Sequence, residues 1–380
     1  MPSAPAAEAH AESRPLHVAI GVLAGVVGGP ATYARRLIDA LVRLPDAPRV
    51  TVLCDSRRAL DLDVCDVIEV PMRGGIDRLR WQHFALPAAI RRIAPDLYHD
   101  TKNALPRRLR VPGVVTVHDL AYHTVPETFG FWSRRFLRWS TADAVRRAQG
   151  ILVPSQATAV DLAKIHPFTR SKTTVVPHGI DTPRQLSAEQ RTRLHSELHL
   201  PTRYVLHVGT LQARKNVDRL IRAVRSLRAR DADLRCVLVG RQGWLAEPTL
   251  REIAFDDTAI WLGKLPDQAL AAVYSHATVF VSPSAYEGFG FTVADALAAG
   301  VPTIISAVSS LPEVCGEAAL RLDSLDETAI SAAIARVLSN GALADSLRTA
   351  GPRRAAQFTW SSCAATHLAA YRRAVVELRK

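Results

Sequence analysis

The chain has 380 residues, of which 48% are hydrophobic, enough for two domains that each bury a core. Its formal net charge of +12 is spread over both halves, and since no recognised nucleic-acid-binding motif accompanies it, we expect no nucleic-acid partner. No apolar run reaches the roughly 18 residues of a membrane-spanning helix. The five cysteines are odd in number and lack metal-ligand spacing, which favours reduced thiols and a cytoplasmic location.

The first segment, residues 1–15, contains neither the basic nor the apolar region of a signal peptide, so we expect a disordered lead. Residues 16–22 then predict a buried strand, followed by a glycine-rich turn over 23–30 and an amphipathic helix over 32–44. A dinucleotide-dependent oxidoreductase would carry G-x-G-x-x-G in this turn, a spacing that its glycines do not supply.

Four more strands are predicted in the first half, each separated from the next by a helix. This alternation is typical of an α/β doubly wound sheet. The strands cover residues 50–54, 97–99, 114–118 and 151–154.

Polar residues end two of these strands. His118 lies at the carboxyl end of strand 114–118, where open α/β sheets bind ligands, and Asp119 could hold its ring. The other interpretation is a histidine that is hydrogen-bonded within the scaffold. Tyr98 and His99 end the preceding strand and, with Asp119, are candidates for the acceptor side of a site.

Arginines alternate with aromatic residues between positions 131 and 147, and a further basic cluster lies at 107–110. A basic helix with aromatic anchors suits an anionic membrane surface or an anionic lipid-phosphate acceptor. The alternative is a solvated helix whose aromatic residues pack in the core. The residues concerned are Phe131, Trp132, Arg134, Arg135, Phe136, Arg138, Trp139, Arg146 and Arg147.

The second half opens with a polar stretch, residues 182–200, which is typical of an interdomain linker. A second sheet is expected to start with strand 204–208, whose following loop leads into a helix that ends near residue 228. Arg214 and Lys215 lie near the start of this helix, where cations oppose the helix dipole. They are favoured there if they face an anion such as a diphosphate; otherwise they are solvated surface charges.

A strand, loop, helix and strand unit is predicted over residues 278–305. Its loop contains Gly288 and Gly290, which allow the backbone to come close to a ligand. Free N–H groups at the start of the following helix would bind a phosphate group. These N–H groups belong to Phe291, Thr292 and Val293.

Two carboxylates flank this amide cluster, Glu287 in the loop and Asp295 in the helix. Glu287 could bind the hydroxyls of a sugar and Asp295 those of a ribose, so that the pair would hold a nucleotide-sugar at both ends. The alternative needs no ligand, because Thr292 and Asp295 also have the spacing of a helix-capping pair.

The segments EGFGFTVAD (287–295), GVP (300–302) and SSLPE (309–313) together resemble the donor-site signature of the retaining glycosyltransferase family 4. Further motifs agree in the same order as in that family, and the likeness extends from about residue 16 to the end. In its details the chain is most similar to bacterial mannosyl- and rhamnosyltransferases of surface polysaccharide synthesis. The further motifs are TVHD (116–119), VPHGID (176–181), VGTLQARKN (208–216), LVG (238–240) and GKLPD (263–267).

The resemblance implies the GT-B fold, in which two Rossmann-like domains face each other across a cleft. An acceptor-side domain would then cover residues 16–181, followed by the linker 182–200. A nucleotide-sugar-binding domain would cover 201–357, and the last segment, 358–380, would form a helix that crosses back onto the first domain.

The resemblance also implies a role for each matching residue, with His118, Lys215 and Glu287 as the catalytic group. Lys215 would neutralise the leaving diphosphate; Arg214 would help, because this chain has Thr210 where many relatives have arginine. Asp295 is one methylene shorter than the glutamate usual in the family, so a ribose contact would need a water or a small backbone shift. The remaining donor-side residues are Gly28, Gly29, Gly240, Leu265, Gly288, Gly290, Phe291, Thr292 and Val293.

Neither a cofactor nor a metal ion is expected, because the one Asp-x-Asp sequence, residues 61–63, precedes no recognisable site feature. The predicted activity is retaining transfer of a hexose, with GDP-mannose or a related donor, to a saccharide or lipid-linked saccharide. The enzyme would act in the cytoplasm, with peripheral association at the inner face of the membrane. Two alternatives stay open, a sugar-nucleotide epimerase of the same fold and a nucleotide-sugar-binding relative without catalysis.

Overall fold

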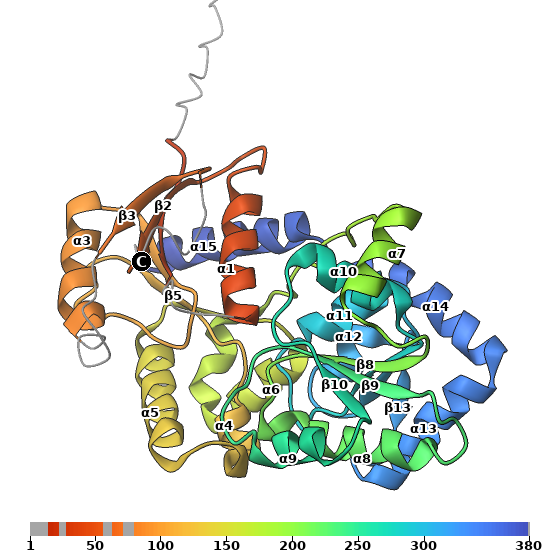
Figure 1. The fold of residues 1–380 in the computed structure, drawn as a ribbon. Coiled ribbons are helices and arrows are strands. Elements are labelled where there is room, and N and C mark those ends of the chain that lie inside the picture. Colours follow the sequence, from red (N-terminus) through yellow and green to blue (C-terminus); the bar gives the residue numbers. More distant parts are fainter. Residues whose placement is uncertain (1–13, 23–27, 56–62, 71–79, 379–380) are drawn as a thin grey trace, which may run out of the picture.

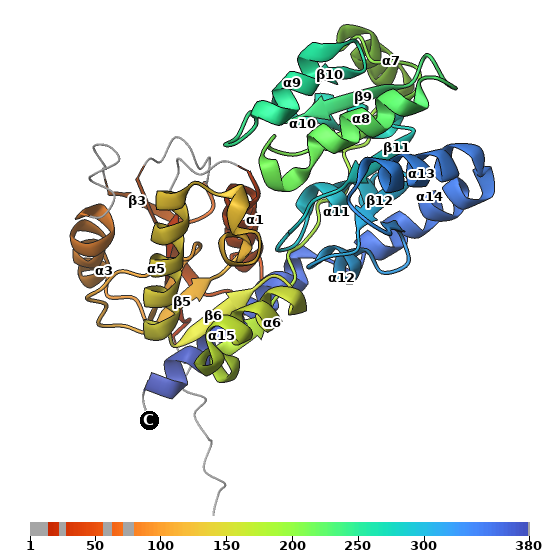
Figure 2. The ribbon, with the colours of Figure 1, turned by 90° about the horizontal axis from the view of Figure 1, so that it is seen from below.

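The computed structural model describes residues 14–22, 28–55, 63–70 and 80–378, which form two lobes placed side by side (Figure 1). The expected lead over residues 1–13, most of the first glycine-rich turn and Asp61 lie outside the described residues. Each lobe contains one parallel sheet with helices on both faces (Figures 1 and 2). The predicted α/β class is therefore confirmed.

The N-terminal sheet has seven strands in the order β3-β2-β1-β4-β5-β6-β7. Its inner strand β1 is buried on both faces, as expected of an apolar run in a parallel sheet. The strands are β1 (His17–Val22), β2 (Arg49–Cys54), β3 (Asp66–Glu69), β4 (Leu97–Asp100), β5 (Gly113–Thr116), β6 (Gly150–Val153) and β7 (Thr173–Val175). Its helical segments are α1 (Gly29–Leu41), η2 (Trp81–Ala85), α3 (Leu86–Ile93), α4 (Ala121–Thr124), η3 (Pro126–Thr128), α5 (Phe131–Arg147), α6 (Gln156–Ile165) and η4 (Pro167–Lys172).

The C-terminal sheet repeats this order over six strands, β10-β9-β8-β11-β12-β13. Helix α8 shows how its helices pack: Val217, Leu220, Ile221 and Val224 recur at helical spacing and are fully buried. The strands are β8 (Tyr204–Val208), β9 (Arg235–Val239), β10 (Ala259–Trp261), β11 (Val279–Ser282), β12 (Thr303–Ser306) and β13 (Leu320–Leu322). The helical segments are α7 (Ala188–Glu197), η5 (Ala213–Lys215), α8 (Val217–Leu227), α9 (Glu247–Phe255), α10 (Asp267–His276), α11 (Phe291–Ala298), α12 (Leu311–Cys315), α13 (Glu327–Ser339) and α14 (Gly341–Ala355).

Most predicted boundaries agree within about a residue, and three differences bear on the site or on the domain division. Helix α1 begins three residues early, because Pro30 suits a first helical turn and Gly28, with φ of 87°, precedes it. Strand β5 ends at Thr116, so His118 lies two residues beyond the strand. The expected linker contains α7, which a capping box of Ser187 and Gln190 starts and which packs on α10 of the C-terminal domain.

The last helix, α15 (Trp360–Leu378), returns to the N-terminal domain and packs on α1, β4, β5 and β6 (Figure 2). A buried network fixes it there. The hydroxyl of Tyr33 lies 2.7 Å from Nε2 of His367 and 2.8 Å from the hydroxyl of Thr116. His99 lies 2.8 Å from Thr116 and 2.8 Å from the hydroxyl of Tyr371. The chain end is thus part of the N-terminal core.

Direct hydrogen bonds also join the two domains. The carboxylate of Glu313 accepts from the backbone N–H groups of Gln156 and Ala157 at the start of α6, at 2.8 and 3.1 Å. The hydroxyl of Tyr286 donates to Asp161 at 2.9 Å. An anionic side chain is favourable at a helix N-terminus, so the Glu313 contact stabilises this arrangement of the domains.

Candidate active site

Both sheets reverse their strand order at a central pair, β1 and β4 in one domain and β8 and β11 in the other. In open α/β sheets, ligands bind in the crevice beyond the carboxyl ends of such strands. Most of the predicted site residues lie in the loops that follow β1, β8 and β11, or in the loop that follows β5. The fold therefore gathers them into the region between the domains.

The loops after β8 and β11 bring together two cations and one carboxylate. Glu287 accepts hydrogen bonds from Lys215 and, at 3.0 Å, from Arg214. Burial disfavours the charge of Glu287, but the two cations outweigh this effect and lower its pKa to about 2. Burial lowers the pKa of Lys215 and Glu287 opposes this effect, whereas the pKa of Arg214 is raised. With all three side chains ionised, the group has one net positive charge, which suits an anionic ligand.

Backbone contacts hold this ionised group in place. The N–H of Ala285 donates to the carbonyl of Arg214 at 2.8 Å, and the Arg214 guanidinium donates to the carbonyl of Tyr286. Asn216, which adopts a left-handed conformation just before α8, donates to the carbonyl of Pro283 at 2.8 Å. The two loops are thus fastened side by side before any ligand binds, which favours preorganised electrostatics.

Helix α11 starts as its glycines predicted. Gly290 precedes the helix with φ of 95°, a left-handed conformation that favours glycine. The first N–H groups of any helix lack partners within it, so those of Phe291, Thr292 and Val293 are suited to a phosphate. Gly288 has a different role from the one expected, since a Cβ there would lie 1.8 Å from the carbonyl oxygen of His118. It allows the two domains to touch.

His118 lies opposite this loop. Its Nε2 is 2.8 Å from the carbonyl oxygen of Thr101, which can only accept, so Nε2 carries the proton and Nδ1 is left as an acceptor. Burial lowers the pKa of His118 to about 4, which keeps the ring neutral. Asp119 does not hold this ring as expected, because it accepts instead from the N–H of Ala121 at the start of α4.

Tyr98 and His99 do not reach the region between the domains. Both side chains are fully buried in the N-terminal domain. The hydroxyl of Tyr98 donates to Asp100 at 3.0 Å, and both ring nitrogens of His99 are used in the network that anchors α15. The prediction that they face an acceptor is wrong, because Tyr98 packs in the core on one face of the sheet and helix α15 covers His99 on the other.

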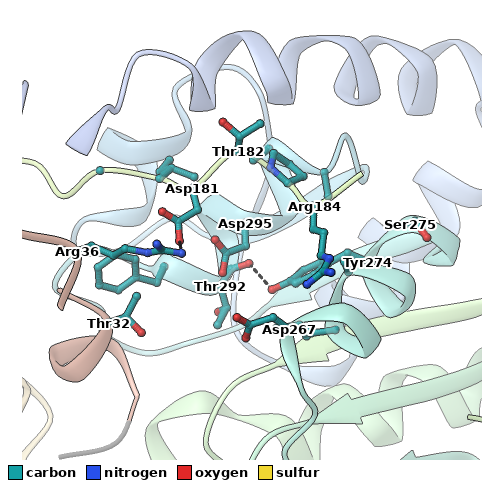
Figure 3. A pocket seen from close by; sticks show the side chains of 18 of the residues that line it. Thr32, Arg36, Asp181, Thr182, Arg184, Asp267, Tyr274, Ser275, Thr292 and Asp295 are labelled. Atoms are coloured by element: carbon teal, nitrogen blue, oxygen red, sulfur yellow. Dashed lines mark hydrogen bonds and ion pairs between the residues drawn. The ribbon is translucent and has the colours of Figure 1, made fainter. Parts of the chain in front are cut away.

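A cavity of about 780 Å³ lies between the domains, beside α1 and α11 (Figure 3). It brings together Gly28, Gly29, Phe291, Thr292 and Asp295, all predicted to bind the donor. The sequence prediction missed other lining residues, which come from the connecting segment and from helix faces. Asp181 and Asp267 end two of the quoted motifs, residues 176–181 and 263–267, and so could have been found. The missed residues include Thr32, Arg36, Asp181, Arg184, Asp267, Tyr274 and Trp360.

Asp295 lines this cavity near Asp181 (Figure 3). The capping interpretation is wrong, because Gly290 is the residue that precedes α11 and no side chain caps the helix. Burial raises the pKa of Asp295 to about 7, and the carboxylates of Asp181 and Asp267 add to this effect. Asp181 itself is paired with Arg36 at 2.6 Å. Asp295 is therefore a half-buried acid that faces the cavity.

Gly240 and Leu265 lie outside this cavity. A Cβ at Gly240 would lie 2.0 Å from the carbonyl oxygen of Gly209, so the residue lets β8 and β9 end close together. Leu265 packs against the core of the C-terminal domain. Their expected place among the donor-side residues stays a prediction.

Two family descriptions match the chain, one on each domain. Residues 27–184 match Glycosyltransferase Family 4, and residues 190–354 match Glycosyl transferases group 1. The O-antigen chain mannosyltransferase B of Escherichia coli is 31% identical over 291 residues, which are 75% of this chain and 76% of that protein. The chain belongs to glycosyltransferase family 4.

Other relatives of this glycosyltransferase agree. A D-inositol 3-phosphate glycosyltransferase of Corynebacterium efficiens is 29% identical over 318 residues, 78% of this chain and 72% of that protein. The MMP alpha-(1->4)-mannosyltransferase of Mycolicibacterium hassiacum is 30% identical over 238 residues, 61% of this chain and 56% of that protein.

Solved structures share the fold of the glycosyltransferase. Sucrose-phosphate synthase from Thermosynechococcus elongatus superposes with a TM-score of 0.76 at 22% identity, covering 94% of this chain and 98% of that one. Anabaena HepE, solved in complex with UDP and glucose, gives 0.74 at 18% identity, covering 93% and 99%. The fold is GT-B, as predicted.

Two features are absent from the described part of the glycosyltransferase. Among those residues, no helix has the length and apolar character needed to cross a bilayer. Nor do three or more His, Cys, Asp or Glu side chains gather there in a way that could hold a metal ion.

Proposed function

We propose that the enzyme transfers a mannose-like hexose, with retention of configuration and without a metal ion, from a nucleotide-sugar to a saccharide or lipid-linked saccharide. The observation that carries this proposal is the ionised group of Arg214, Lys215 and Glu287 beside the free N–H groups of α11. The names of two relatives, both mannosyltransferases, support the choice of sugar.

Each residue would then have a chemical task. Lys215, Arg214 and the first N–H groups of α11 bind the diphosphate and stabilise the negative charge that develops as it leaves. Glu287 binds hydroxyls of the transferred sugar, and Asp295 binds the ribose. His118, which is neutral, offers Nδ1 to a sugar hydroxyl across the interface.

The reaction would take place on one face of the sugar. The bond from the anomeric carbon to the diphosphate oxygen breaks, and the acceptor oxygen bonds to the same carbon from the same side. The departing diphosphate takes the proton of the acceptor hydroxyl, so no protein base is needed. The positive charges of Arg214 and Lys215 would stabilise the leaving diphosphate, a task that a metal ion performs in other enzymes.

The resting site already contains an anion, the carboxylate of Glu287. Since both cations bind it, an incoming diphosphate must compete for them, and Glu287 is then released to the sugar hydroxyls. A complete nucleotide-sugar compensates Glu287 for its lost ion pairs through the sugar hydroxyls, whereas a free nucleoside diphosphate has no sugar to do so. This coupling favours the intact donor.

A thermal-shift panel of nucleotide-sugars tests the donor, because a ligand at about 100 times its Kd stabilises by roughly 2.7 kcal/mol. Hexose 1-phosphates, which lack the nucleotide, are the control. Turnover of the stabilising donor should give a product of retained anomeric configuration by NMR, with or without EDTA. An inverted product would reject the one-face mechanism, and activity that EDTA abolishes and Mg²⁺ restores would reject metal independence.

The place of action is part of the same proposal. We propose that the enzyme works in the cytoplasm as a peripheral protein at an anionic membrane surface, where a lipid-linked acceptor would be found. The high positive charge supports this location.

A further inference from the structure

Helix α5 has two faces of different chemistry. Its outward residues Phe131, Trp132 and Trp139 are 55%, 78% and 46% exposed, although large aromatic side chains are usually buried. Arg135 is exposed on the same side of the helix and lies over the ring of Phe131 at 5.8 Å. The alternative in which these aromatic residues pack in the core is therefore wrong for all three.

Two other segments extend this surface. Phe84, just before α3, is 61% exposed and lies under Arg108 at 5.6 Å. The neighbouring Arg107 lies over Trp139 at 5.3 Å, which makes the surface continuous from α5 to Phe84. We call these residues the aromatic-basic surface: Phe84, Arg107, Arg108, Phe131, Trp132, Arg135 and Trp139. Helices α3 and α5 lie on the part of the N-terminal domain remote from α13 and α14 (Figures 1 and 2).

The charge of this surface is poorly neutralised. Within the described ranges, neither Arg108 nor Arg135 has a carboxylate in ion-pair distance, and Arg107 shares Asp143 with Arg147. Arg138 and Arg147, which the sequence grouped with the surface cations, instead donate to backbone carbonyl groups inside the domain. Unpaired cations over exposed aromatic rings suit a partner surface with an anionic outer layer and an apolar layer directly beneath it.

The inner face of α5 contacts the wall of the candidate active site. Thr141 lies 2.6 Å from the hydroxyl of Tyr122 and accepts from Asn103 at 3.3 Å. Asn103 is two residues from Thr101, whose carbonyl accepts the Nε2 proton of His118. One helix therefore connects the aromatic-basic surface to the loop that orients His118.

We infer that the aromatic-basic surface docks the enzyme on an anionic phospholipid bilayer, with α5 lying in the headgroup layer and the His118 side of the site close to the membrane. Tryptophan and phenylalanine enter the interface, and the arginines pair with lipid phosphates. A lipid-linked acceptor would then reach the site from the bilayer. That last step rests on the proposed transfer reaction, whereas the docking rests on the aromatic-basic surface alone and identifies the surface behind the proposed peripheral location.

Vesicle sedimentation of the full chain tests the docking, with phosphatidylcholine alone and with phosphatidylcholine mixed with phosphatidylglycerol. Binding should need the anionic lipid and should weaken with salt, because the screening length falls from about 10 Å at 0.1 M to about 3 Å at 1 M. Arg108→Ala with Arg135→Ala should weaken binding about 30-fold, roughly fivefold for each arginine. Trp132→Ala with Trp139→Ala should weaken it at least as much.

The C-terminal domain offers a matched control. Phe255 is 74% exposed and lies under Arg225 at 4.7 Å, but Arg225 is paired with Glu252 and Asp256. Phe255→Ala should therefore leave vesicle binding unchanged. All variants should keep the parent's thermal melting and its stabilisation by nucleotide-sugar, since none of these residues lies at the donor site.

Three results would overturn the inference. One is equal binding to neutral and anionic vesicles, and another is an equal loss of binding in Phe255→Ala. The third is a loss with the arginine variants alone, which would indicate a general polyanion surface in place of a membrane interface. Failure of the proposed function looks different, because the protein would then bind vesicles but no nucleotide-sugar.

Discussion

The two domains have the same strand order up to their sixth strand. They nevertheless place side chains of different charge near the point where the strand order reverses. In the C-terminal domain, the loops after β8 and β11 hold the ionised side chains of Arg214, Lys215 and Glu287. In the N-terminal domain, the corresponding region beside β4 and β5 holds neutral His99 and His118. The shared backbone therefore sets where a site forms, and the residues after each strand decide its chemistry.

This difference has a physical cause. Buried charges are stable only when they are paired and hydrogen-bonded, and an incoming anion can exchange with one partner of such a pair. Buried neutral histidines and tyrosines form a fixed network instead, here one that ties α15 to β4 and β5. The proposed function thus requires the C-terminal domain to exchange one partner of its ionised group, while the buried network of the N-terminal domain forms a fixed wall.

The two domains should differ in their stability to acid, and this difference is the largest effect that we expect. Burial lowers the pKa of His99, His118, His178 and His367, so the unfolded chain binds protons below pH about 6.5 that the folded cluster does not. Stability should therefore fall as the pH drops from about 6.5 to 4, by on the order of 3 kcal/mol for His118 alone.

Urea unfolding at several pH values, with limited proteolysis to locate the first cleavage, measures this effect. In the C-terminal domain, His207 also has a lowered pKa, but Glu287, with a pKa of about 2, keeps its ion pairs until much lower pH. The N-terminal domain should open first. Opening of the C-terminal domain first, or constant stability over this range, would contradict the comparison.

Removal of one cation should have the next largest effect. Lys215→Ala leaves Glu287 paired with Arg214 alone and takes away a stabiliser of the leaving group, so kcat/KM should fall at least about 100-fold. Arg321→Ala, an exposed cation of the same domain paired with Glu317, is the control and should act like the parent. Steady-state kinetics with the stabilising donor measures both. Near-normal turnover of Lys215→Ala would remove this residue from the site.

Neutralising Glu287 should affect turnover and nucleotide affinity in opposite directions. Glu287→Gln removes the anion that occupies both cations, so a free nucleoside diphosphate should bind about tenfold more tightly, a change of about 1.4 kcal/mol. Turnover should still fall, because an amide is a weaker acceptor for sugar hydroxyls. Isothermal titration and kinetics on one preparation measure both quantities. Weaker binding of the diphosphate would show that Glu287 does not compete with it.

The sequence was sufficient for the parts of the fold that depend on local pattern. Apolar runs predicted the inner strands, and the start of α11 just after Gly290 agrees with the predicted N–H groups of residues 291–293. The short edge strands β3, β7 and β13 were missed, because three or four residues of mixed polarity carry no clear periodicity. The location of Lys215 and Glu287 followed from strand ends, but their pairing spans 72 positions and needs both loops.

The errors at the site have a common origin in distant parts of the chain. His99 ends a parallel strand, as a ligand-binding residue would, but Tyr371 from the last helix lies over it, 272 positions away. Asp119 was assigned to His118 by adjacency, whereas the carbonyl of Thr101 from the neighbouring strand end holds that ring. Adjacent residues in a sequence predict which edge of a sheet they reach, but not which partner they meet there.

Asp295 gives the smallest expected effect and tests the donor assignment directly. Its pKa of about 7 lies above the ordinary value, so the folded protein binds a proton at pH 4 to 7 that the unfolded chain has lost, and its charge destabilises the fold as the pH rises. Asp295→Asn should therefore keep or raise the stability at pH about 8. If the parent's carboxylate accepts ribose hydroxyls there, as proposed, the variant should bind nucleoside diphosphate several-fold more weakly.

Titration calorimetry between pH about 6 and 8, with denaturant melts of the same samples, measures both effects. The affinity of the parent should rise with pH as Asp295 ionises, whereas that of Asp295→Asn should not. Asp345→Asn changes an exposed carboxylate remote from the cavity and should follow the parent. A helix cap would behave differently, with a stability loss of roughly 0.5 to 1 kcal/mol and unchanged nucleotide affinity. That outcome would remove Asp295 from the donor site and leave the ribose to another side chain of the cavity.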